Sequence, residues 1–260
     1  MKRYVRIQLG HESCYAQEVD GKLELLTGEI PAEFCSTGVR IETSQVTRFL
    51  PPVIPGKRIL GIGRNYNRPE FTPADIPKVP KVFLKSSGAM IQSGEDIVLT
   101  PMNEDVIAEP EIAFLIGKNG SHIPESLAMD YVAGYLVVND VTDRAHLKQD
   151  GGEWTRGKSA DTFLPMGRYL VTDIDGAHLN VSCQVNDIEV VSGNTADMIF
   201  PIPKLISFIS HFMSLEAGDI IMTGTPRGPA IHAGDRVKVI VENVGEIENP
   251  VVFCGNNWNM

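Results

Sequence analysis

Two glutamates that flank a proline are the residues of this sequence whose types and spacing first suggest chemistry. Glu109 and Glu111 stand on either side of Pro110, directly before the apolar run of residues 112–117. Residues two apart in a strand point to the same side of a sheet, and the proline favours an extended Glu109. Ionised carboxylates that are close together and buried need compensation. The pair predicts a bound cation, and a strand start that faces water is the alternative.

Asp140 is the third carboxylate of interest because it ends the strand-like segment of residues 131–140. Side chains often converge on a site where strands end, although an aspartate here could equally form a turn. Three carboxylates without a nearby His or Cys make an all-oxygen set of ligands. Such a set suits a hard cation, which predicts Mg2+, with Mn2+ or Ca2+ as substitutes, and argues against zinc.

The composition is that of an ordinary globular protein with an acidic surplus. The 260 residues include 33 Asp and Glu against 23 Lys and Arg, which gives a formal net charge of -10. Without a basic block, nucleic acid is not expected as a partner. An acidic protein that binds an acidic small molecule needs local positive charge, from a metal or from a few placed Lys and Arg.

Membrane spans and disulfide frameworks are not expected. The first ten residues alternate apolar and charged types, which is typical of a strand, and no apolar run approaches the ~18 residues of a membrane span. The cysteines at positions 14, 35, 183 and 254 are scattered and form no CxxC pair. We therefore expect a cytoplasmic protein without membrane association.

Strand-like segments dominate the pattern, and they predict a mainly β or α+β protein with mixed sheets. Short alternating segments precede a Pro-rich connector at residues 51–57, so we expect a small N-terminal β-unit over residues 1–52 and a main domain over residues 53–260. The expected strands of the main domain cover residues 58–63, 81–86, 97–100, 111–117, 131–140, 167–172, 179–186, 219–225 and 235–242.

Few helices are expected. The clearest lies between Pro203 and Gly218. There, apolar residues recur at helical spacing, namely Leu205, Ile206, Ile209, Phe212 and Met213. A shorter helix is expected over residues 124–132.

The chain resembles the fumarylacetoacetate hydrolase superfamily from about residue 58 to residue 253. Matching segments follow the family's order and include "GIGRNY", "EPEIAFLIGK", "DYVAGYLVVNDVTDR", "WTRGKSADTFLPMGRYLV" and "GDIIMTGTPRG". The resemblance implies a mixed β-sandwich roll with few helices, often with a small N-terminal β-domain, that assembles as a homodimer. It also implies that Glu109, Glu111 and Asp140 bind the divalent cation.

Further site residues are implied by the same resemblance. Lys158 matches the family's active-site lysine, which would hold a developing oxyanion, and Arg144 matches an arginine that orients the substrate or the metal ligands. Both are therefore expected to be catalytic.

Binding of the substrate is implied for a second group of residues. Thr225 would hold the substrate carboxylate through its hydroxyl and backbone N–H, with Gly224 beside it, and Tyr66 would line the pocket. Arg64 and Lys85 are weaker candidates, because either could equally be a surface charge or lie behind the site.

The family's usual substrates are small 2-oxo or 2,4-dioxo carboxylic acids, whose adjacent carboxylate and carbonyl oxygens chelate one metal. A cation then polarises the carbonyl and stabilises an enolate. Hydrolysis of a C–C bond, decarboxylation and isomerisation all pass through such an enolate. The resemblance thus implies a metal-dependent enzyme acting on a small oxo acid.

One departure from the family pattern bears on the reaction. Hydrolytic members commonly have Asn-Tyr-x-x-His-x-x-Glu, whose His-Glu dyad activates water, but Pro69 and Thr72 stand at those positions here. Glu70, Arg68 or His146 could compensate. Hydrolysis of an acylpyruvate or a related acid is expected ahead of a 2-hydroxyhepta-2,4-diene-1,7-dioate type of isomerase or an oxaloacetate-type decarboxylase. A binder of metal and oxo acid with little turnover is the remaining alternative.

Overall fold

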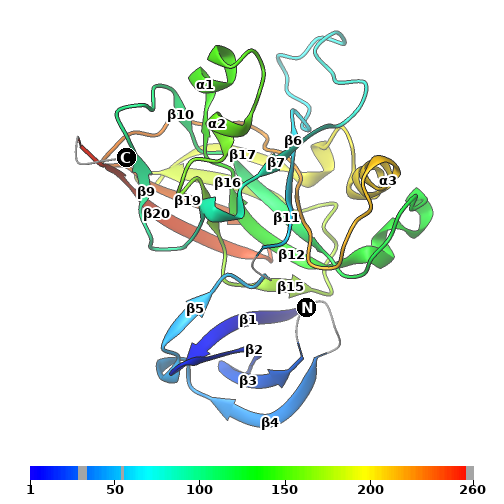
Figure 1. Ribbon diagram of the computed structural model, residues 1–260, viewed down its shortest axis with the longest axis vertical. Helices are drawn as coiled ribbons and strands as arrows, with labels where there is room; N and C mark the ends of the chain where they lie inside the picture. The colour runs from blue at the N-terminus through cyan, green and yellow to red at the C-terminus, as the bar shows by residue number, and fades with distance from the viewer. Residues whose placement is uncertain (29–33, 54–55, 256–260) are drawn as a thin grey trace.

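Strands make up most of the molecule and helices are few, as the sequence predicts (Figure 1). The computed structural model describes residues 1–28, 34–53 and 56–255. The strands are β1 (Lys2–Leu9), β2 (Glu12–Val19), β3 (Lys22–Thr27), β4 (Cys35–Ile41), β5 (Arg48–Leu50), β6 (Ile59–Gly63), β7 (Lys81–Lys85), β8 (Met90–Gln92), β9 (Ile97–Leu99), β10 (Val106–Ile107), β11 (Pro110–Ile116), β12 (Val132–Asn139), β13 (Thr142–Asp143), β14 (Leu164–Met166), β15 (Leu170–Thr172), β16 (Asn180–Val185), β17 (Ile188–Asn194), β18 (Ile220–Met222), β19 (Arg236–Val241) and β20 (Gly245–Phe253). The α-helices are α1 (Arg144–Gln149), α2 (Thr155–Lys158) and α3 (Ile202–Phe212).

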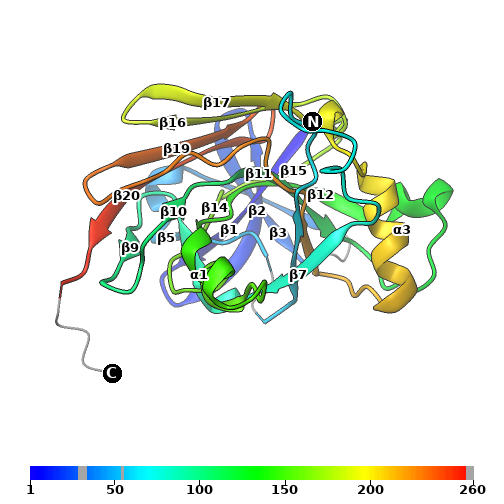
Figure 2. The same ribbon diagram turned by 90° about the horizontal axis from the view of Figure 1, so that it is seen from above.

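Two large sheets hold most of these strands. In the described residues, the order along the larger sheet is β4-β3-β2-β1-β15-β12-β11-β18-β6-β7. The second sheet has the order β17-β16-β19-β20-β9 and packs against β11 and β12, so that it lies over them in Figure 2. Parallel pairs such as β18 with β6 occur beside antiparallel ones, and this confirms the mixed-sheet architecture.

Strand β11 is buried on both of its faces. Ile112 and Phe114 pack into the core shared with the second sheet, whereas Ala113 and Leu115 pack into a different cluster on the opposite face. Because side chains alternate along a strand, Glu111 shares the side of Ala113 and Leu115. A carboxylate therefore begins a strand that protein covers on both sides.

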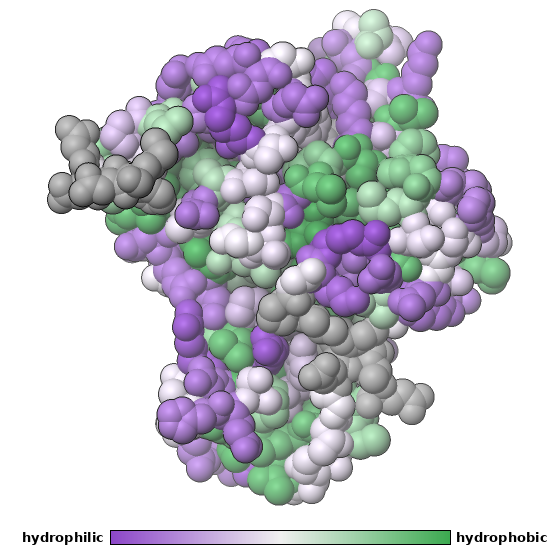
Figure 3. Space-filling view, in the orientation of Figure 1, coloured by the Kyte–Doolittle hydropathy of each residue, from purple (hydrophilic) through white to green (hydrophobic). Residues whose placement is uncertain are grey.

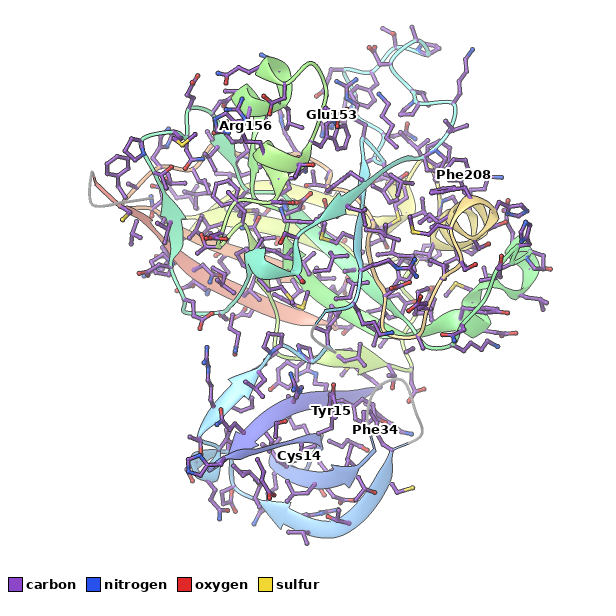
Figure 4. The ribbon with its side chains drawn as sticks, in the orientation of Figure 1. Cys14, Tyr15, Phe34, Glu153, Arg156 and Phe208 are labelled. Atoms are coloured by element: carbon purple, nitrogen blue, oxygen red, sulfur yellow. The ribbon has the colours of Figure 1, made fainter. Side chains whose placement is uncertain are left out.

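Strands β1 to β4 form a meander and β5 returns to pair with β1, and this part of the molecule, drawn at the bottom of Figure 1, has a core of its own. The rings of Tyr15 and Phe34 lie 5.2 Å apart within this part of the molecule (Figure 4). Strand β1 also pairs with β15, where Tyr4 stands opposite Leu170, so the larger sheet continues from one part into the other. The division into units at residue 52 stays a prediction, as do the homodimer and the cytoplasmic location.

The main predicted helix is α3, and it ends earlier than the sequence pattern suggests. Leu205, Ile206 and Ile209 are buried, and Phe208, labelled in Figure 4, packs against the same core. Phe212 is the last helical residue and is 58% exposed, because the core does not extend that far. The shorter predicted helix is a 3-10 helix, η3 (Glu125–Tyr131). None of the helices in the described chain is both long enough and apolar enough to cross a membrane.

Gly134 of β12 marks a close approach between backbones. A Cβ atom there would lie 2.9 Å from the carbonyl oxygen of Val171 in β15. We expect Gly134→Ala to lower the free energy of unfolding by about 1–3 kcal/mol, because the added methyl group must push a paired strand aside. Denaturant unfolding measures this. Gly255→Ala is the control, since a Cβ at Gly255 meets no atom within 4 Å. Equal stability of the two variants would contradict the prediction.

Candidate active site

Three carboxylates meet where β11 begins and β12 ends. The two strands are antiparallel, with Glu111 opposite Val138, so the start of one lies beside the end of the other. The backbone N–H of Asp140 donates to the carbonyl oxygen of Glu109 at 2.9 Å. One carboxylate oxygen from each of Glu109, Glu111 and Asp140 lies within 4.8 Å of the others. This juxtaposition is the one that the sequence predicts for a metal site.

Neighbouring side chains fix Glu109 at the edge of the sheet. Asn139 accepts a hydrogen bond from the backbone N–H of Glu109 at 2.9 Å through its Oδ1 atom. The hydroxyl of Thr142 donates to Glu109 Oε2, also at 2.9 Å. Both partners are buried, so the glutamate is oriented by groups that have little freedom to move.

Gly224 orients Glu111. Its backbone N–H donates to Glu111 Oε2 at 2.7 Å. Gly224 has a φ of +96°, and a Cβ atom there would lie 2.8 Å from the carbonyl oxygen of Ile62. Only glycine combines this conformation with this close approach, which explains a glycine immediately after β18 and Thr223.

Two buried lysines balance part of the negative charge. The ammonium group of Lys158 contacts a carboxylate oxygen of Glu109 and lies 2.5 Å from Asp140 Oδ2. Lys85 lies 2.5 Å from Asp140 Oδ1 and donates to the carbonyl oxygen of Val141 at 3.1 Å. Asp140 is thus held from both sides by ammonium groups.

The pKa shifts follow from this arrangement. Burial raises the pKa of Glu111 well above its usual value, and the charges of Asp140 and Glu109 raise it further. Burial also acts to raise the pKa of Asp140, but Lys158 and Lys85 outweigh it and the net shift is downward. For Lys158, burial acts to lower the pKa, yet the nearby carboxylates outweigh it and keep the ammonium form stable.

The residues present fit a divalent cation. Three carboxylates face two ammonium groups, and Glu111 makes no ion pair within the described chain. A donor set made only of carboxylate oxygens is the one that Mg2+ and Mn2+ prefer. The surplus negative charge, and the raised pKa of the carboxyl that carries it, are what a cation would relieve.

A cavity of about 700 Å³ opens onto these groups. Glu109, Glu111, Thr142 and Lys158 lie in its wall together with Trp154. A groove of about 950 Å³ lies elsewhere, beside β1 and β20, and contains none of the residues predicted from the sequence. The smaller cavity is therefore the candidate site.

Three of the other predicted residues also line the cavity. Arg144 begins α1 and pairs with Asp105, with Nη2 and Oδ1 separated by 2.7 Å. Thr225 is buried, and its hydroxyl donates to the carbonyl oxygen of Arg227 at 2.9 Å. Arg64 is exposed and has a φ of +57°.

The remaining predicted residues lie beside the cavity and do not line it. Tyr66 is only 1% exposed, and its backbone forms an isolated antiparallel β-bridge with Met198. The N–H of Gly224 is committed to Glu111, and Lys85 reaches only Asp140 and Val141. Gly224 and Lys85 thus support the carboxylates, and none of the three residues is part of the cavity wall.

The segment that departs from the hydrolase pattern forms one side of the cavity. Arg68, Glu70 and Phe71 line it, whereas Pro69 and Thr72 are exposed and do not. His146, one of the residues that could replace the dyad, is buried with its Nδ1 atom 3.4 Å from Asp143 and does not reach the cavity wall.

Asp143 is a structural residue of the site that the sequence analysis missed. Its carboxylate caps α1 by accepting from the N–H of Ala145 at 3.0 Å, and it also accepts from the N–H groups of Glu104 and Asp105. The helix that begins with Arg144 is thereby tied to the loop before β10. The preference of aspartate for the N-cap position of a helix is the signal that could have identified it.

Comparison with known proteins agrees with the geometry. The model of the family described as "Fumarylacetoacetate (FAA) hydrolase C-terminal" matches residues 58–252. The mitochondrial oxaloacetate tautomerase Fahd2a of Rattus norvegicus is 38% identical over 224 residues, which are 82% of this chain and 71% of that protein.

Two solved structures are also similar. The 2-hydroxyhepta-2,4-diene-1,7-dioate isomerase of Mycobacterium marinum has a TM-score of 0.88 at 31% identity, covering 97% of this chain and 99% of the other. The fumarylpyruvate hydrolase of Pseudomonas aeruginosa, solved with Mn2+ and pyruvate, has a TM-score of 0.69 at 26% identity, covering 80% of this chain and 93% of that one.

Proposed function

The chain belongs to the fumarylacetoacetate hydrolase family, and from this premise we propose that it catalyses the keto–enol tautomerisation of a small 2-oxo acid such as oxaloacetate. One observation carries the proposal. Glu109, Glu111 and Lys158 line the cavity with Asp140 directly beside them, while Pro69 and Thr72 supply no His-Glu dyad at the positions where hydrolytic relatives have it. These groups are suited to stabilising an enolate, and the dyad that activates water in hydrolytic relatives is absent from its positions.

Tautomerisation requires only two proton transfers at the site. A proton leaves C3 and a proton arrives at the oxygen on C2, with no carbon–carbon bond broken and no water consumed. A divalent cation held by Glu109, Glu111 and Asp140 would supply a Lewis acid for the 2-oxo carboxylate. Lys158, whose pKa the nearby carboxylates raise against the effect of burial, stays protonated and donates to the C2 oxygen as negative charge develops.

The C3 proton requires a base. Glu70 lines the cavity and makes no hydrogen bond or ion pair through its side chain within the described residues, so its carboxylate is available for proton transfer. Asp75, also in the wall, instead accepts hydrogen bonds from the N–H and hydroxyl of Thr72. We assign Glu70 the role of base.

Hydrolysis of a C–C bond, which the sequence favours, is the second candidate. The similarity to the fumarylpyruvate hydrolase supports it. Without a His-Glu dyad at Pro69 and Thr72, hydrolysis would require Glu70 to activate water in addition to the enolate chemistry, whereas tautomerisation requires only proton transfer. Tautomerisation is therefore placed first.

A comparison of two substrates tests the proposal. We expect the purified protein with Mg2+ to accelerate the decay of the enol absorbance of oxaloacetate above the rate in Mg2+ buffer alone, and chelation of the metal should abolish the acceleration. An acylpyruvate assayed in parallel should be cleaved more slowly, because cleavage needs activated water. Faster cleavage of the acylpyruvate than ketonisation of oxaloacetate would contradict the assignment and favour the hydrolase.

A further inference from the structure

Arg68 lies in the wall of the cavity, and no ion pair with a described residue balances its positive charge. Arg68 is half-buried, and its Nε atom is buried without a hydrogen-bond partner in the part of the chain that the structure describes. Leaving a buried donor of a charged group unpaired is costly. An anion that enters the cavity is therefore the partner suited to the charge of Arg68.

Two more guanidinium groups reinforce this positive region. Arg64 and Arg227 line the same cavity, and none of the three arginines forms an ion pair with any described residue. Burial lowers the pKa of Arg68, and the charges of Arg227 and Arg64 act in the same direction, against Glu70 and Glu109. Like charges are thus held close together, although the protein is acidic as a whole.

An aromatic ring positions the central guanidinium. The Cζ atom of Arg68 lies 5.5 Å from the centre of the Phe71 ring, and Phe71 also lines the cavity. Contact with the face of a ring leaves the N–H groups at the edge of the guanidinium free for hydrogen bonds in its plane. Carboxylates match this edge and bind it through two parallel hydrogen bonds.

We propose that Arg68, supported by Arg64 and Arg227, binds a second carboxylate of the substrate, and that the enzyme selects 2-oxo dicarboxylic acids over 2-oxo monocarboxylic acids. The inference rests on the proposed function for the end of the substrate that meets Glu109, Glu111 and Lys158. The cavity of about 700 Å³ accommodates a four-carbon acid, and Arg68 lies close enough to Glu109 for the two charges to interact, so the two ends of the site are near each other. The local positive charge that an acidic protein needs for an acidic ligand is then supplied at each end of the cavity.

Malate and 2-hydroxybutanoate test the selection without any turnover. Both are unreactive four-carbon 2-hydroxy acids, and they differ in having a carboxylate or a methyl group at the far end. In calorimetric titrations of the Mg2+-loaded protein, we expect malate to bind more tightly. Arg68→Met should weaken the affinity for malate by about 10- to 100-fold, the size expected for the loss of a charge-assisted hydrogen-bonded pair. The affinity for 2-hydroxybutanoate should change by less than about twofold.

Two further variants define the outcome. Arg156→Met is the matched control, because Arg156 pairs with Asp150 on the hydrophilic surface over α1 and α2 and lies outside the cavity (Figures 3 and 4). Arg68→Lys should retain part of the preference for malate, since it keeps the charge without the planar edge. An unchanged preference in Arg68→Met, or equal weakening of both acids, would overturn the inference.

The result is separable from the proposed function. If the protein does not tautomerise oxaloacetate but loses its malate preference in Arg68→Met, the second subsite stands and the reaction is wrong. If the protein tautomerises oxaloacetate and Arg68→Met keeps the preference, the reaction stands and the subsite is wrong.

Discussion

Replacing Glu111 with glutamine is expected to abolish metal-dependent activity and leave the chain folded. Glutamine keeps the size of the side chain but removes one anionic ligand of the three. The affinity for Mg2+ or Mn2+ should fall by more than the ~10- to 100-fold that loss of a group behind the ligands typically costs. The fold should survive, because a buried carboxyl that crowds two others is removed. Calorimetric metal titration and thermal unfolding measure the two effects.

The control for this variant is Glu153→Gln. Glu153 is an exposed glutamate before α2, labelled in Figure 4, and it takes no part in the group of three carboxylates. Its replacement should leave the metal affinity unchanged. Normal metal affinity in Glu111→Gln would remove Glu111 from the ligand set and with it the present account of why a carboxylate begins a core strand.

Replacing Lys158 with methionine is expected to lower kcat by about 100- to 1,000-fold, which corresponds to ~2.7–4 kcal/mol of barrier. The KM should change much less, because a contact to a developing oxyanion is weaker in the ground state than in the transition state. Metal affinity should be kept or increased, since the ammonium group of Lys158 competes with a cation for Glu109 and Asp140.

Lys148→Met is the matched control, because Lys148 also lines the cavity but is exposed and contacts none of the three carboxylates. Its turnover should stay close to that of the wild type. Unchanged turnover in Lys158→Met would show that Lys158 only balances charge. A loss of metal binding in that variant would instead make the lysine a structural part of the metal site.

The sequence predicts the carboxylates well because local rules place them. Two-residue periodicity puts Glu109 and Glu111 on one side of a strand, and Asp140 follows directly from the end of another. The antiparallel pairing of β11 with β12 is then enough to bring the three together. The same periodicity predicts most of the strands that surround the site.

Contacts between distant parts of the chain are what local rules could not supply. Lys85 reaches Asp140 from β7, and Gly224 reaches Glu111 from the turn after β18, although neither partner is near in sequence. Their roles depend on which strands lie side by side in the sheet, and the pattern of a single segment does not specify this. Helices α1 and α2 were missed for a different reason, since six and four residues are too few to show helical periodicity.

The loops are the remaining part of the site that the sequence does not predict. The acidic composition predicts that positive charge must gather where an acidic ligand binds, but it does not say which arginines supply that charge. Arg64, Arg68 and Arg227 lie on irregular segments whose paths depend on packing against the rest of the fold. Only the folded chain shows that they share one cavity.

Exchange of the C3 protons of oxaloacetate in deuterated water is the most direct test of the central claim, because proton transfer at C3 defines a tautomerase. With Mg2+ bound, the wild type should accelerate deuterium incorporation, as followed by NMR, far above the rate in Mg2+ buffer, with the carbon chain intact. Lys158→Met should lose the acceleration. Incorporation no faster than in buffer, or carbon–carbon cleavage that outpaces it, would contradict the account.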